Sequence, residues 1–138
     1  ARIGVAVQPV GVPFSVFNTK RGAGEYGVWY GGCSGEAVDV CLEAVLKTPD
    51  AATGAGALNY GQYSNSAYDG MLEKARATDA GPARDKALAE VTDFVMRDEP
   101  IIPLYHFHHI FGYGPHVAAY VMHPRGWTTA MQATPAAN

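Results

Sequence analysis

The stretch NSAYDGMLEKARATDAGPARDKALAEVTDFVMRDEPIIPLYH, residues 65–106, decides the fold, because it encodes two consecutive helices and an apolar exit segment. Ser66 is a good N-cap residue. Asp69 follows three positions later, which is the spacing of a capping box and places a carboxylate in the positive first turn. We therefore expect the first helix from Ala67 to about Arg76, with a break at 78–81.

The second helix is expected from Pro82, because proline is tolerated at the first helical position, where its missing N–H would be unpaired anyway. Apolar residues then recur at spacings of three and four and form one stripe: Ala87, Leu88, Val91, Phe94 and Val95. Pro100 ends this helix. Residues 101–106 are mostly apolar and contain Pro103, which predicts a strand at a sheet edge or a crossover.

Three phrases occur in one order along this part of the chain: YSNSAYDGMLEKAR at 63–76, DEPIIPLYH at 98–106 and VAAYVMHPRG at 117–126. Together they resemble the bacterial extracellular solute-binding proteins of family 5, the peptide- and nickel-binding periplasmic receptors of ABC transporters. The resemblance implies an α/β fold, namely the C-terminal part of a periplasmic-binding-protein type II-like lobe. Residues 1–106 would belong to the second α/β lobe. Residues 107–138 would form the crossover strand and the C-terminal segment that returns to the first lobe.

The same resemblance implies a function. The chain would belong to the solute-binding component of an ABC importer, which captures a peptide or related small solute between two lobes and delivers it to the permease in the inner membrane. Family members are several times longer, so the chain is expected to be a fragment whose partner is the missing N-terminal part of the same protein. A periplasmic or extracellular location is implied, with no cofactor and no enzymatic activity.

Length and composition set limits on these expectations. With 138 residues, the chain is one domain or part of one. It is 48% hydrophobic, enough for a core, and its formal net charge of −3 leaves no evident basic face for nucleic acid. The apolar runs are far shorter than the ~20 residues that a membrane-spanning helix needs.

The N-terminal part predicts a strand–helix–strand unit. Residues 3–10 form an apolar run closed by proline, which is typical of a buried strand. Residues 12–21 can form a short helix, and residues 26–32 a second, glycine-weakened strand, so we expect one right-handed βαβ unit. An amphipathic helix is expected within 35–48 and a long loop over 49–62.

Glu36 is the leading candidate for ligand binding. In an ungapped comparison it takes the place of an aspartate that, in peptide-binding relatives, pairs with the free α-amino group of the ligand. A buried ammonium must be paired, because its desolvation otherwise costs several kcal/mol. The alternative is a solvated carboxylate near a helix start. Trp29, Tyr30 and Cys33 are expected near the cleft wall, with Cys33 standing where the family has tryptophan.

Two further residue types leave alternatives open. Cys33 and Cys41 fit an oxidising compartment, and they form either a disulfide, if their α-carbons lie within about 7 Å, or two buried free thiols. In the full-length family that the chain resembles, either cysteine could also pair with one outside this chain. His106, His108 and His109 could offer imidazoles to a metal. They define two alternative functions: a periplasmic metal or metal-chelate (nickel-type) binding protein, or a small metal-dependent hydrolase. No HExxH, CxxC, Gly-x-Ser-x-Gly or phosphate-loop pattern supports an enzyme.

Overall fold

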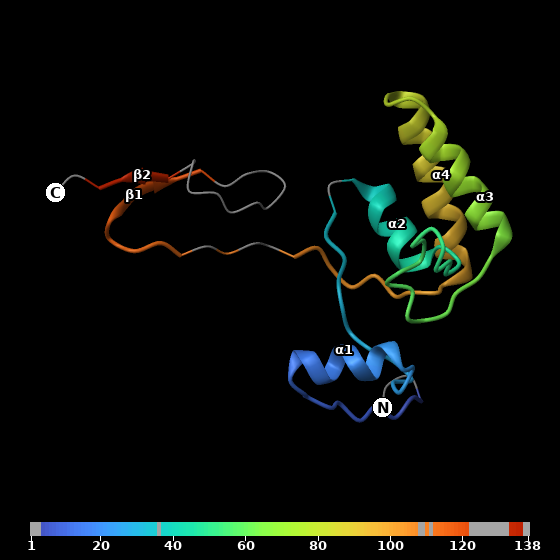
Figure 1. Ribbon diagram of the computed structural model, residues 1–138, viewed down its shortest axis with the longest axis horizontal. Helices are drawn as coiled ribbons and strands as arrows, with labels where there is room; N and C mark the ends of the chain where they lie inside the picture. Colours follow the sequence, from blue (N-terminus) through green and yellow to red (C-terminus); the bar gives the residue numbers. More distant parts are fainter. Residues whose placement is uncertain (1–3, 36, 108–109, 111, 122–132, 137–138) are drawn as a thin grey trace.

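The computed structural model describes residues 4–35, 37–107, 110, 112–121 and 133–136. Its elements in chain order are α1 (Phe14–Gly22), α2 (Val38–Leu46), α3 (Ser66–Ala77), α4 (Pro82–Asp98), β1 (Val117–Tyr120) and β2 (Ala133–Pro135). Helices α2, α3 and α4 lie against one another, whereas α1 and the β1–β2 pair lie apart from them (Figure 1). The three packed helices are called the helical bundle below.

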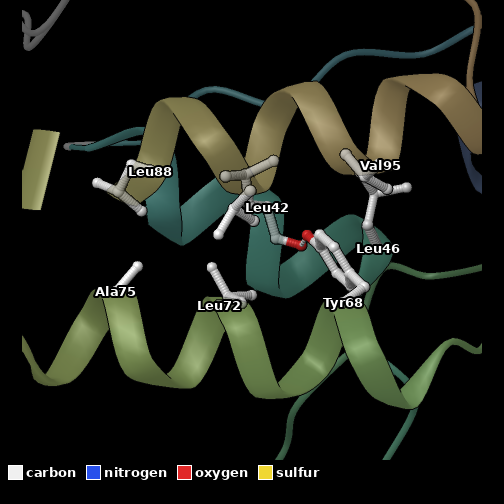
Figure 2. Packing of buried hydrophobic residues seen from close by; sticks show 8 residues of the cluster. Leu42, Leu46, Tyr68, Leu72, Ala75, Leu88 and Val95 are labelled. Carbon is white, nitrogen blue, oxygen red and sulfur yellow. Dashed lines mark hydrogen bonds between the residues drawn. The ribbon is translucent and has the colours of Figure 1, made fainter. Parts of the chain in front are cut away.

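The hydrophobic core lies inside the helical bundle. Side chains from α3 point toward those of α4, and α2 covers the seam between the two helices (Figure 2). The buried set is Leu42, Leu46, Tyr68, Leu72, Ala75, Leu88, Val91 and Val95. The apolar stripe predicted for the second long helix is therefore confirmed. Each fully buried Leu or Val contributes roughly 1.5–3 kcal/mol, which makes this cluster the main source of stability.

Helix α3 begins at Ser66, one residue before the predicted start at Ala67. The N-cap is Asn65, whose Oδ1 accepts hydrogen bonds from the backbone N–H of Ala67 at 3.0 Å and of Tyr68 at 3.2 Å. The predicted Ser66 cap is therefore wrong, since asparagine caps as well as serine and here stands one position earlier. The Asp69 carboxylate accepts a hydrogen bond from the backbone N–H of Thr48 at 3.1 Å, so it does not form the predicted capping box.

The predicted boundaries of α4 are largely confirmed. Pro82 stands at its start, and Arg97 lies in its last turn. The helix ends at Asp98, and Glu99 then adopts the left-handed conformation with φ 51° just before Pro100. Helices α1 and α2 likewise fall inside the ranges expected for them, apart from one extra residue of α1 at Gly22.

The strands predicted over 3–10, 26–32 and 101–106 are absent from the described residues of those ranges, and the βαβ prediction is wrong for them. A strand needs a hydrogen-bonded neighbour, and no described residue forms a backbone ladder with these ranges. The one sheet in the described part of the chain pairs β1 with β2 antiparallel, with Tyr120 opposite Ala133. The α/β lobe and the boundary between 106 and 107 stay predictions.

The predicted long loop before α3 is organised by one buried amide. Asn59 Nδ2 donates to the carbonyl oxygens of Lys47 at 2.9 Å and of Tyr63 at 2.8 Å, and its Oδ1 accepts the N–H of Tyr63 at 3.1 Å. Gly56 has φ 64°, and a Cβ there would collide with the Lys47 carbonyl. The loop is thereby held against the end of α2, which places Tyr60 beside α1 residues.

Candidate ligand-binding site

A disulfide fixes the segment that carries the predicted site residues. Cys33 and Cys41 are bonded, with their α-carbons 5.8 Å apart, so the bridge is formed and the free-thiol alternative is wrong. Cys41 belongs to α2, which is part of the helical bundle. The residues beside Cys33 are therefore anchored to the bundle. The bridge is compatible with an oxidising, extracytoplasmic compartment. Within the described ranges, no helix has the length and apolar character to cross a membrane.

The anchored segment faces the chain that leaves α4. Gly32, Cys33 and Ser34 lie opposite His106 and Phe107 across a hollow of about 430 Å³. A Cβ on Gly32 would stand 2.9 Å from a ring carbon of Phe107, closer than real side chains allow. A side chain at position 32 would therefore make the exposed Phe107 ring move aside. We call this hollow the 32–107 hollow.

Phe107, which lines the 32–107 hollow, belongs to an aromatic cluster. The ring centroids of Tyr105 and Phe107 are 5.1 Å apart, and Tyr30 lies 6.5 Å from each of them. We call Tyr30, Tyr105 and Phe107 the aromatic trio. The two tyrosine hydroxyls are hydrogen-bonded to each other, and this bond raises the pKa of Tyr30 above its ordinary value. More than half of each of the three residues remains exposed.

Trp29 lies in a different cluster from its neighbour Tyr30, as expected where side chains alternate along extended backbone. Its ring contacts Phe17 of α1 at 6.3 Å and Tyr60 at 6.1 Å between centroids. The guanidinium carbon of Arg21 stands 4.9 Å from the Trp29 ring centre and 4.1 Å from that of Tyr60. This cation–π arrangement connects α1 to the loop before α3, so Trp29 is not placed at the hollow.

Of the remaining candidate residues, the structure describes one and leaves three undescribed. His106 is exposed and lines the 32–107 hollow. Glu36, His108 and His109 lie outside the described residues. In the part of the chain that the structure describes, no group of three His, Cys, Asp or Glu side chains is arranged to hold a metal ion.

Sequence reasoning missed the aromatic trio as a unit. It named Tyr30, but it did not connect this residue with Tyr105, which lies 75 positions further along the chain. A usable signal was present, because Tyr105 and Phe107 are two residues apart in an extended segment and such residues share a face. A second hollow of about 420 Å³, between α4 and Val38, contains none of the predicted site residues.

The 32–107 hollow combines polar and aromatic groups in its described lining. Its described lining offers a hydroxyl from Ser34, an imidazole from His106 and an aromatic ring from Phe107, and it includes no carboxylate or ammonium group. Between residues 28 and 34, the backbone forms no hydrogen bond to another described residue. These peptide groups are free to pair with a bound molecule. No protein-family model, curated protein or solved structure matches this chain.

Proposed function

We propose that the chain is part of the second lobe of a solute-binding receptor of an ABC importer. The receptor captures a peptide or related small solute between two α/β lobes and delivers it to the permease in the inner membrane. The chain has a binding role in this proposal and no catalytic one. The proposal places the protein in the periplasm or on the outer side of the cell, where a disulfide such as Cys33–Cys41 persists.

One observation carries the proposal: two apolar segments are extended, exposed and without strand partners. Residues 5–10 and 101–107 have no backbone hydrogen bonds to other described residues. Their exposed apolar side chains are Val5, Val7, Val10, Ile101, Ile102, Leu104, Tyr105 and Phe107. Exposed apolar side chains on backbone without strand partners are typical of segments that pair with another strand or become buried in an interface. In the proposed receptor, these segments enter sheets completed by further chain.

The position of the 32–107 hollow supports the same proposal. One of its walls is formed by His106 and Phe107, where the resemblance puts the end of the second lobe and the start of the crossover strand. Ligands of two-lobed receptors bind where the lobes close on one another, at such a passage. Cys33, which the sequence predicts near the cleft wall, lines this hollow, and the ring of Tyr30 lies 6.5 Å from that of Phe107, another lining residue.

The proposal is tested in cells that make the protein. An antibody raised against this chain should detect a polypeptide several times heavier than the chain, in the fraction released by osmotic shock. Disruption of its coding sequence should abolish uptake of radiolabelled peptides, while uptake of a sugar serves as the control. Detection in the cytoplasm only, or undiminished uptake of every peptide tested, would contradict the proposal.

A further inference from the structure

Helix α4 has a second face, beside the stripe that packs into the core. Its residues follow Asp85 at three, four, seven and eight positions, which is the spacing of one side of a helix. Together with Val38 at the start of α2, they line the second hollow of about 420 Å³: Asp85, Leu88, Ala89, Thr92 and Asp93. We call this hollow the 85–93 groove. We propose that it is a docking site for a basic amphipathic helix of another protein, an interaction that goes beyond the proposed uptake function.

The middle of the 85–93 groove is apolar and low. Ala89 is exposed but short, and Leu88 beside it is directed into the core, with only 7% of it exposed. Val38 forms the apolar wall on the α2 side, and 54% of it is exposed. A small residue at the centre of a helix face lets a second helix approach to the usual interaxial distance of about 8–10 Å. The apolar face of an amphipathic helix would then cover Val38.

A carboxylate borders the groove at each end of its α4 side. Asp85 and Asp93 are exposed and lie eight residues apart, which corresponds to about 12 Å along the helix axis. Carboxylates around an apolar surface attract basic residues and reject acidic ones, so they select the partner by its charge. The matching helix has Lys or Arg at two positions about eight residues apart, with apolar residues between them on the same face.

Asp85 and Asp93 differ from the other carboxylates of the bundle helices. The other Asp and Glu side chains of α2, α3 and α4 each form an ion pair or a hydrogen bond with a described residue: Asp39, Glu43, Asp69, Glu73, Glu90 and Asp98. The basic residues on both sides of Asp85 also face other carboxylates, since Arg84 pairs with Asp39 and Lys86 with Glu90. Among the described residues, none therefore neutralises the two carboxylates of the groove, and a basic partner can.

The test uses the 138-residue chain and two fluorescein-labelled peptides. The basic probe is an alanine-based helix of about 18 residues, with leucines between two lysines that stand eight positions apart. The acidic probe has glutamate in place of both lysines. Fluorescence anisotropy at low salt should show the basic probe binding about tenfold more tightly, because two attractive contacts are exchanged for two repulsive ones. The difference should shrink as salt is added.

A matched pair of double variants tests the charges. Asp85→Asn with Asp93→Asn should weaken binding of the basic probe about three- to tenfold. Asp79→Asn with Glu99→Gln removes the same total charge at exposed sites outside the groove, and it should change the affinity by less than about twofold. Equal losses in the two double variants would show unspecific attraction to an acidic protein and would overturn the inference.

A second pair tests the shape of the groove. Ala89→Gln places a longer side chain in its middle and should abolish binding, whereas Ala83→Gln, at an exposed site of α4 outside the lining, should leave it unchanged. Failure of both probes to bind, or unaltered binding by Ala89→Gln, would overturn the inference. So would a loss of self-association in Ala89→Gln, because the groove would then receive a second copy of this chain. None of these results concerns peptide uptake by cells, so a failed docking site is distinguishable from a failed transport function.

Discussion

At the scale of single residues, Asn59 holds the loop before α3 against the end of α2. Only 4% of it is exposed, and its amide makes three hydrogen bonds to main-chain groups at 47 and 63. An amide is suited to this position because it donates twice and accepts once with one planar group. Neither a carboxylate nor an aliphatic side chain can replace both of its donors.

We expect Asn59→Asp to destabilise the fold by roughly 2–3 kcal/mol, because two partly buried carbonyl oxygens lose their donor and face a negative charge instead. Chemical unfolding in urea, followed by circular dichroism, measures the loss. Gln8→Glu makes the same amide-to-carboxylate change at an exposed position and should be nearly neutral. Equal stability of the two variants would show that the Asn59 hydrogen bonds contribute little.

Tyr63 makes the stability of the fold depend on pH in the alkaline range. Its hydroxyl donates to the Asp98 carboxylate at 2.8 Å, and burial together with this bond raises its pKa from 10.0 to about 12. Since the pKa is raised by folding, the contribution to stability is complete below pH 10 and is lost as the pH rises through 12. The free energy of unfolding should fall more steeply over that interval in the native chain than in Tyr63→Phe.

Tyr113→Phe provides the matched control for this pH effect, because Tyr113 is exposed. Its stability should follow the native curve between pH 10 and 12. Tyr63→Phe should also lose about 1 kcal/mol at neutral pH through the missing hydrogen bond. Parallel pH curves for Tyr63→Phe and the native chain would refute the assignment.

At the scale of elements, a charged cluster connects α2 to the other two helices of the bundle. Asp39 Oδ2 lies 2.8 Å from Arg84 Nη2 and 3.6 Å from Arg76 Nε, and Arg76 Nη1 lies 2.5 Å from Glu43 Oε1. Arg84 Nη1 also donates to the Arg76 carbonyl at 3.2 Å, near the end of α3. Asp39 is only 5% exposed, so its charge is balanced by these two guanidinium groups.

Asp39→Asn should destabilise the bundle by about 2 kcal/mol, since it keeps the shape but removes the buried charge that both arginines face. The effect stays moderate because the arginine side chains are partly exposed and can regain water. Asp93→Asn, on the exposed side of α4, serves as the control and should change stability by less than about 0.5 kcal/mol. Thermal unfolding by circular dichroism compares the two variants, and indistinguishable midpoints would contradict the expectation.

The elements also differ in how well the sequence predicts them. Helix α4 carries its own signals, a proline at the start and an apolar stripe, so its range could be read from neighbouring residues. The segments 5–10 and 101–107 have strand-like composition, but pairing requires a partner that local sequence does not specify. The 32–107 hollow is harder still to predict, because its walls are more than seventy residues apart and meet only through tertiary contact.

At the scale of the whole molecule, the described chain divides into a well-packed part and an unprotected part. The helical bundle buries its apolar stripe, whereas Ile102 and Leu104 on the chain leaving α4 are 79% and 67% exposed. Figure 1 shows the same contrast, with the compact bundle on one side and the β1–β2 pair well away from it. We expect this exposed apolar surface to become buried by association in solution.

We therefore expect the 138-residue chain to self-associate at micromolar concentration, because burying this surface between copies removes it from water. Sedimentation velocity over a concentration series measures the association. The double variant Ile102→Ser, Leu104→Ser should shift the distribution toward monomer without loss of helix signal, because neither side chain belongs to the core. Val38→Ser, which replaces an exposed apolar side chain on α2 outside this segment, should leave association unaltered. If the native chain stays monomeric throughout the series, its exposed residues 101–107 are tolerated in water. The exposed segment would then no longer support the receptor proposal.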